Sequence, residues 1–194
     1  MQSDAKRRFF IALIPPQALQ DQANQIKQYV ADRYHSRAAQ KSPPHITLQA
    51  PFEWSVNDYP QLEQQLTTFA AQQDPIALTL DGFAAFPPRV IFIDVERSPA
   101  LLTLQSALTG WLEDTLGIVD RRAKGRDFAP HLTVAFRDLT KPNFKLAWQE
   151  FQGRSLHFEW VARDLTLLIH DGQCWQIYQN FSFNRPPLKI SQDR

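Results

Sequence analysis

The sequence Pro-His-Ile-Thr-Leu at residues 44–48 is followed later in the chain by Pro-His-Leu-Thr-Val at residues 130–134, in the same order of residue types. Side chains two positions apart on a β-strand point to the same face. His45 and Thr47 are therefore expected to project together from one strand, and His131 and Thr133 from the other. Such repetition favours an internal duplication, in which the two motif strands face each other across a cleft.

The flanking sequence divides into two halves with a similar order of elements. Residues 8–97 are expected to form strand, helix, strand, helix and two strands, and residues 98–185 helix, strand, helix and three strands. We predict one α+β domain over residues 1–185, built from pseudo-repeats at residues 8–97 and 98–185. The tail at residues 186–194 is expected to be loose.

Hydrophobic periodicity and turn residues place the individual elements. The elements expected in the first half are strands at 8–14, 45–48, 76–83 and 90–95 and helices at 16–34 and 59–73. Those expected in the second half are helices at 98–116 and 142–151, strands near 130–134 and 156–160, and a final hairpin turning at Asp171-Gly172. Two apolar faces are predicted: Leu19, Ala23, Ile26, Val30 and Tyr34 on the first helix, and Trp175, Ile177, Phe181 and Phe183 on the last strand.

The composition excludes several classes of protein. The 194 residues include 21 Lys and Arg against 20 Asp and Glu, and this balance disfavours binding to nucleic acid or membrane through bulk charge. The one cysteine, Cys174, cannot form a disulfide within the chain or supply a thiolate metal site. No apolar run approaches the roughly 20 residues of a membrane span. We expect a cytoplasmic protein with no membrane partner that acts as a monomer.

The paired histidines point to acid–base chemistry at phosphorus. The unperturbed pKa of histidine is about 6.5, so one imidazole can accept a proton from water while the other donates one to a departing oxygen. The hydroxyls of Thr47 and Thr133 would hold the non-bridging phosphate oxygens. This chemistry requires no metal and no cofactor, and the sequence lacks a His/Cys/Asp/Glu cluster with zinc-site spacing.

These tetrapeptides resemble the defining motifs of the 2H phosphoesterases, in particular the bacterial LigT-like group of 2′-5′ RNA ligases or RNA 2′,3′-cyclic phosphodiesterases. Residues 8–13, 89–92 and 126–131 are also similar to that group. The resemblance implies a bilobal fold with two facing antiparallel sheets flanked by helices. It further implies hydrolysis of RNA 2′,3′-cyclic phosphate ends to 2′-phosphates and reversible 2′-5′ joining. His45 would then be the general acid, and His131 would activate water.

The position of the phosphate-binding arginine departs from the family's pattern. Related enzymes place an Arg five residues after the second motif's histidine, where this chain has Phe136, and Arg137 follows. On a regular strand this shift turns the side chain to the other face unless a bulge intervenes. Arg126, in the basic loop at residues 121–126, is therefore a second candidate beside Arg137.

The remaining candidates are weaker, and two other functions stay open. His35, His157 and His170 are expected at the surface, and Phe86 is one of several aromatics that could stack on a base. The first alternative substrate is a small cyclic phosphate, such as a nucleoside 2′,3′-cyclic phosphate or ADP-ribose cyclic phosphate. The other alternative is a non-catalytic module that binds RNA ends. The partner is accordingly an RNA with a 2′,3′-cyclic phosphate or 2′-5′ linkage, or a small cyclic nucleotide.

Overall fold

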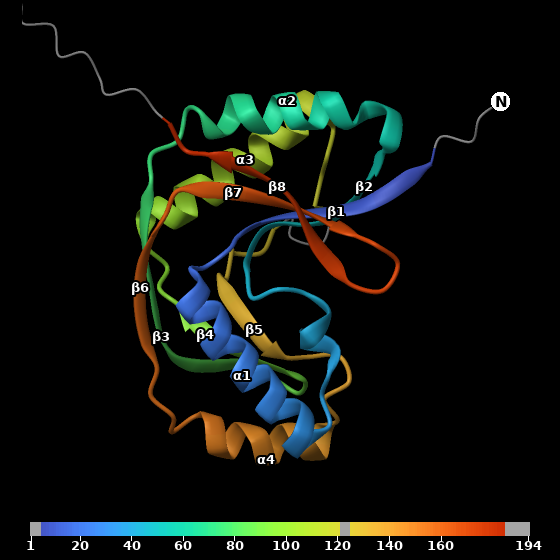
Figure 1. The fold of residues 1–194 in the computed structure, drawn as a ribbon. Helices are drawn as coiled ribbons and strands as arrows, with labels where there is room; N and C mark the ends of the chain where they lie inside the picture. The colour runs from blue at the N-terminus through green and yellow to red at the C-terminus, as the bar shows by residue number, and fades with distance from the viewer. Residues whose placement is uncertain (1–4, 121–124, 185–194) are drawn as a thin grey trace, which may run out of the picture.

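A computed structural model describes residues 5–120 and 125–184, which form two four-stranded antiparallel sheets with helices packed on them (Figure 1). The first sheet has the order β2 (Ile46–Ser55), β1 (Lys6–Leu13), β7 (Asp164–His170), β8 (Trp175–Ser182). The second has the order β5 (His131–Ala135), β4 (Val90–Val95), β3 (Ile76–Phe86), β6 (His157–Ala162). The predicted α+β fold with two antiparallel sheets is confirmed. Each sheet takes strands from both halves of the chain, so the boundary between residues 97 and 98 does not separate the sheets.

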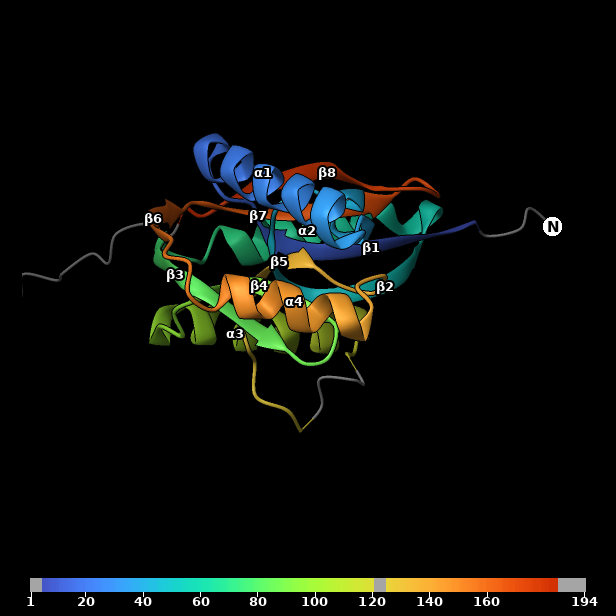
Figure 2. The same cartoon turned by 90° about the horizontal axis from the view of Figure 1, so that it is seen from below.

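The helices form pairs, one on each sheet. Helices α2 (Tyr59–Ala70) and α3 (Pro99–Leu116) pack against β8 and β2 of the first sheet, and α1 (Gln17–Tyr34) and α4 (Lys141–Phe151) against β5 and β4 of the second. Figure 1 shows α2 and α3 at the top of the molecule and α1 and α4 in its lower part, and Figure 2 shows the same fold from below, with α4 in front. Two short 3₁₀ helices, η1 (Ala38–Lys41) and η2 (Val56–Asp58), flank β2. No helix within the described ranges is long and apolar enough to cross a membrane.

Helix α3 illustrates how local sequence sets an element's bounds. The hydroxyl of Ser98 accepts a hydrogen bond from the Leu101 amide, and Pro99 occupies the first turn, where no amide hydrogen is needed. Gly117 ends the helix in the left-handed conformation, at φ 66°. The predicted leucine stripe is buried: Leu101, Leu104, Leu108 and Leu112.

Helix α1 differs from its predicted pattern at one position. Ile26 is only partly buried, whereas the neighbouring Lys27 is 2% exposed and lies in the buried stripe. Lys27 Nζ donates a 2.9 Å hydrogen bond to the Ser42 carbonyl, just before the first motif. Burial lowers the pKa of Lys27 to about 8. A hydrophobicity pattern does not anticipate a lysine held in this way by a backbone carbonyl.

Strand β1 separates the main core from the space between the sheets. Alternate residues Phe9, Ile11 and Leu13 belong to the large core, whereas Phe10 and Ala12 belong to a small cluster with Leu168. The small cluster includes Trp175 as a partly buried member. The face of β1 that bears Phe10 therefore supplies one wall of the site described below.

The four apolar residues predicted to share one face of the last strand lie on different faces. Trp175 packs on the Phe10 cluster, Phe181 and Phe183 lie in the main core, and Ile177 is 49% exposed. The reason is a register shift, since Leu167 pairs with Gln179 but Leu168 pairs with Ile177, which leaves Tyr178 unmatched. One extra residue reverses the alternation of side chains.

Several expected elements have different bounds or fall outside the described residues. Strand β2 runs to Ser55, well beyond residue 48, and includes Pro51, which an edge strand tolerates. Helix α2 ends at Ala70 rather than residue 73. The basic-loop residues 121–124 and the predicted tail at 186–194 lie outside the described residues.

Candidate active site

The two motif strands are the edge strands β2 and β5, and they contact each other where the two sheets meet. His45 lies immediately before β2, and His131 is the first residue of β5. A cavity of about 580 Å³ lies there and is lined by residues of both sheets. His45, Thr47, His131 and Thr133 all line this cavity, which we call the cleft. The structure therefore brings together the four residues of the paired motifs.

Both histidines are held by the backbone in the same way. His45 Nδ1 lies 2.7 Å from the Pro43 carbonyl oxygen, and His131 Nδ1 lies 2.8 Å from the Ala129 carbonyl oxygen. A carbonyl only accepts, so the neutral ring must bear its proton on Nδ1 and its lone pair on Nε2. Each Nε2 is thus the atom that can exchange a proton with a molecule in the cleft.

Aromatic side chains surround both imidazoles. The Phe10 ring centroid lies 4.7 Å from that of His45, and the centroids of Phe86 and Phe92 lie 5.2 Å and 5.1 Å from that of His131. These rings exclude water from one side of each histidine. They also leave an apolar surface inside the cleft, since Phe86 is 41% exposed.

The surroundings of each ring lower the pKa of its imidazole. For His45, burial is the main cause and lowers the pKa to about 4, and the positive charges of Lys27 and His131 act in the same direction. Burial also lowers the pKa of His131, where the Asp94 carboxylate opposes the effect. Asp94 is the direct cross-strand neighbour of His131. In the free protein, burial therefore disfavours the charged form of both rings.

Arg137 reaches the cleft although strand alternation would turn it away. Strand β5 ends at Ala135, and Arg137 lies beyond it in the left-handed conformation, at φ 59°. The Asp138 amide donates to the Phe136 carbonyl across this tight turn. Alternation no longer applies past the strand end, and Arg137 lines the same cavity as the two histidines.

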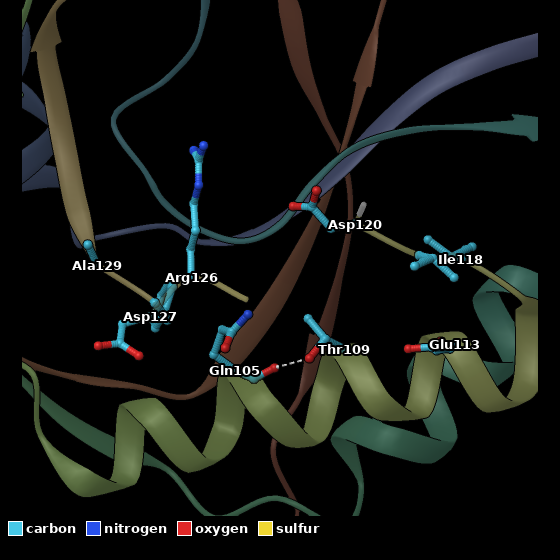
Figure 3. Close-up of a pocket in the computed structure, with 10 residues that line it drawn as sticks. Gln105, Thr109, Glu113, Ile118, Asp120, Arg126, Asp127 and Ala129 are labelled. Atoms are coloured by element: carbon cyan, nitrogen blue, oxygen red, sulfur yellow. Dashed lines mark hydrogen bonds between the residues drawn. The ribbon is translucent and has the colours of Figure 1, made fainter. Parts of the chain in front are cut away.

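Arg126 is located elsewhere. It lines a second cavity of about 500 Å³ with residues of α3, including Gln105, Thr109 and Glu113. Figure 3 shows the Arg126 side chain pointing away from α3. The two sequence-derived arginine candidates thus lie in different cavities, and only Arg137 shares one with the paired motifs.

Several residues that line the cleft were not predicted from the sequence to do so. Arg37 and Lys41 line the cleft, and the available signal was their position just ahead of the first motif, which parallels the basic loop ahead of the second. His170 was expected at the surface but lines the cleft, because it shares the face of β7 with Leu168. Its ring centroid is 4.8 Å from that of Trp175. His35 and His157 are exposed, as expected.

A protein-family model described as the 2′-5′ RNA ligase superfamily matches residues 15–173 of the chain. The chain belongs to the 2′-5′ RNA ligase superfamily. One relative is a Geobacillus sp. (strain WCH70) protein whose name calls it a phosphoesterase. It is 31% identical to this chain over 178 residues, which cover 90% of this chain and 95% of the relative. A Geobacillus kaustophilus protein with the same description is 29% identical with the same coverage.

Solved structures share the fold of this superfamily member at lower sequence identity. The crystal structure of the Thermus thermophilus protein TT0787 matches with a TM-score of 0.65 at 21% identity and covers 91% of this chain and 98% of that chain. Apo LigT of Escherichia coli matches with a TM-score of 0.64 at 19% identity and covers 92% and 98%. LigT has also been solved in complex with 3′-AMP. These matches show that the chain has the LigT-like fold.

Proposed function

We propose that the chain is an RNA 2′,3′-cyclic phosphodiesterase that needs no metal, hydrolyses cyclic phosphate ends to 2′-phosphates and joins RNA ends reversibly through 2′-5′ linkages. The supporting observation is the matched pair of histidines, each anchored through Nδ1 and each with Nε2 available in one cavity. Binding alone would require cations and stacking surfaces, not two proton-exchanging groups. The histidine pair therefore favours catalysis over a non-catalytic RNA-end module.

In the proposed reaction His131 Nε2 removes a proton from a water molecule that attacks phosphorus. His45, as imidazolium, donates a proton to the ribose O3′ as the P–O3′ bond breaks, which leaves a 2′-phosphate. For joining, a ribose 5′-hydroxyl replaces the water, and the product contains a 2′-5′ phosphodiester. Each histidine ends in the other's initial protonation state, so a proton must be exchanged with solvent before the next turnover.

The low pKa of His45 determines how this acid becomes charged. In the free protein the His45 ring is neutral at pH 7. A phosphate anion within a few ångströms favours the imidazolium, so the pKa rises when substrate binds and the proton is taken up with it. The hydroxyls of Thr47 and Thr133 and the guanidinium of Arg137 line the same cavity and would hold the non-bridging oxygens.

The dimensions and lining of the cleft suit a nucleotide. Its volume of about 580 Å³ is within the ordinary range for small-ligand sites. The exposed Phe86 ring beside His131 offers a stacking surface for a base. The complexes of Escherichia coli LigT with 3′-AMP and NADP⁺ support nucleotide binding by this fold.

A small cyclic phosphate is the second candidate substrate. The same cleft volume accommodates a single nucleotide, so a nucleoside 2′,3′-cyclic phosphate or ADP-ribose cyclic phosphate could be hydrolysed by the same histidines. Direct comparison of a mononucleotide with an oligonucleotide separates the two substrate classes.

Product analysis tests the proposed reaction. The purified protein is incubated in EDTA with a short RNA that ends in a 2′,3′-cyclic phosphate, and the terminal phosphate is identified by ³¹P NMR. The proposal predicts a 2′-phosphate formed without added metal. A 3′-phosphate, or activity that requires a divalent cation, would contradict it.

A further inference from the structure

Two loops at the rim of the cleft are tied together by one carboxylate. Asp138, in the connection from β5 to α4, accepts hydrogen bonds from Ser36 Oγ at 2.7 Å, the Arg37 amide at 2.8 Å and the Ala38 amide at 3.0 Å. Ser36 is 1% exposed, whereas Arg37 and Asp138 are exposed, so only the hydroxyl side of this joint is shielded from water. The connection from α1 to β2 is thereby fixed beside Arg137.

Positively charged side chains near this joint line the cleft. Arg37, Lys41 and Arg137 line the cavity, and Asp138 is the one carboxylate among its described lining residues. The Asp138 carboxylate is already engaged by two amides and a hydroxyl, which reduces its ability to repel an incoming anion. The aromatic residues Phe10, Phe86 and Trp175 line the cavity as well, so it offers both cationic and stacking surfaces.

The Arg37 side chain forms an exposed ion pair that a ligand can replace. Its guanidinium pairs with Asp32 at 3.7 Å, and both side chains are largely exposed, at 63% and 59%. Exposed ion pairs contribute roughly 0–1 kcal/mol, so a phosphate can displace Asp32 at little cost. The Arg37 main chain, in contrast, is fixed by Asp138.

The number of cations exceeds what one cyclic phosphate requires. A nucleoside 2′,3′-cyclic phosphate bears a single negative charge, and Arg137 with the two threonines can already meet it. Arg37 and Lys41 then remain for a second anion, and on a nucleic acid end the nearest anion is the phosphate on the 5′ side of the terminal nucleoside.

We propose that Arg37, assisted by Lys41, binds this second phosphate, so that the protein prefers an oligonucleotide end over an isolated nucleoside cyclic phosphate. This inference rests on the phosphodiesterase activity proposed above and names its substrate class.

The test compares two substrates across three proteins. The substrates are adenosine 2′,3′-cyclic phosphate and the dinucleotide ApA ending in a 2′,3′-cyclic phosphate, and the proteins are wild type, Arg37→Ala and Arg97→Ala. Arg97 is an exposed arginine outside the cleft lining and serves as the matched control. We expect Arg37→Ala to lower the dinucleotide-to-mononucleotide ratio of kcat/KM about tenfold, as for loss of a charged hydrogen bond, and Arg97→Ala to leave the ratio within about twofold of wild type.

Further arms identify the group that is recognised. Arg37→Lys keeps the charge and should recover part of the ratio. Adenosine 5′-phosphate 2′,3′-cyclic phosphate has the second phosphate without a second nucleoside, and its kcat/KM should fall with Arg37→Ala in the same direction as that of the dinucleotide. An unchanged ratio in Arg37→Ala would overturn the proposed subsite while leaving the phosphodiesterase intact. Absence of wild-type turnover on all three substrates would instead overturn the activity on which the subsite depends.

Discussion

His45 and His131 are held in the same way: in each residue, Nδ1 is hydrogen-bonded to the main-chain carbonyl oxygen of the residue two positions earlier, at 2.7 Å and 2.8 Å. The two neutral rings therefore share one tautomer, and tautomerism does not distinguish their roles. Their electrostatic surroundings do differ. The Lys27 charge disfavours the imidazolium of His45, whereas the Asp94 carboxylate favours that of His131. In the free protein these charges favour protonation of His131 over His45, so the proposed roles require the bound phosphate to raise the pKa of His45.

The pH dependence of kcat/KM should reflect the lowered pKa values of both histidines. A pair in which one histidine reacts charged and the other neutral gives a kcat/KM profile with limbs at the two pKa values of the free protein, whichever residue is the acid. Because burial places both values below 6.5, kcat/KM for a cyclic phosphate should peak below pH 6.5 and decline toward alkaline pH. Asp94→Asn removes the carboxylate that raises the pKa of His131, so the limb of the profile that His131 sets should move to lower pH. A limb that stays in place, or moves to higher pH, would show that Asp94 does not act on His131.

Lys27 should make stability depend on pH in the alkaline range. Its pKa is about 8 in the folded protein against 10.5 for an ordinary lysine, so folding penalises the charged form. This penalty on the free energy of unfolding is about 3 kcal/mol below pH 8, and it disappears as the pH rises to 10.5. Relative to Lys27→Met, the wild-type free energy of unfolding should therefore increase over this interval, as measured by urea denaturation at each pH. Parallel curves for the two proteins would mean that burial does not lower the pKa of Lys27.

Arg137 and Arg126 should differ in their effect on turnover. Arg137 shares the cleft with the histidines, whereas Arg126 lines the cavity beside α3. Loss of a charge-assisted phosphate contact typically costs roughly 1.5–3 kcal/mol, so Arg137→Ala should lower kcat/KM about tenfold to a hundredfold. Arg126→Ala should lower it far less. Steady-state kinetics on one cyclic-phosphate substrate decide the matter, and a larger loss for Arg126→Ala would reverse this assignment.

Much of this arrangement could be predicted because the sequence contains local signals for it. Ser98 and Pro99 mark the start of α3, and the alternation around His45 and His131 places each histidine on the same face as its threonine. Such signals depend only on residues close together in the chain, and the structure agrees with them.

Features that depend on distant residues could not be predicted in this way. The hydrogen bonds from residues 36–38 to Asp138 link segments that are far apart in sequence, and no local sequence pattern predicts them. The position of Arg137 depends on where β5 ends, because strand alternation applies only within the strand. Lys27 was missed for a similar reason, since its partner is a main-chain carbonyl outside its own helix.

In the proposed reaction, two histidines from separate strands act together on one cyclic phosphate. The most direct test of this cooperation is to measure kcat for hydrolysis of an RNA 2′,3′-cyclic phosphate. The proteins compared are wild type, His45→Ala, His131→Ala and the exposed control His157→Ala. Each general acid or base contributes roughly a hundredfold to ten-thousandfold, so both cleft variants should lose at least a hundredfold while His157→Ala stays near wild type. Circular dichroism confirms that each variant is folded. Near-wild-type turnover in either folded cleft variant would contradict the account.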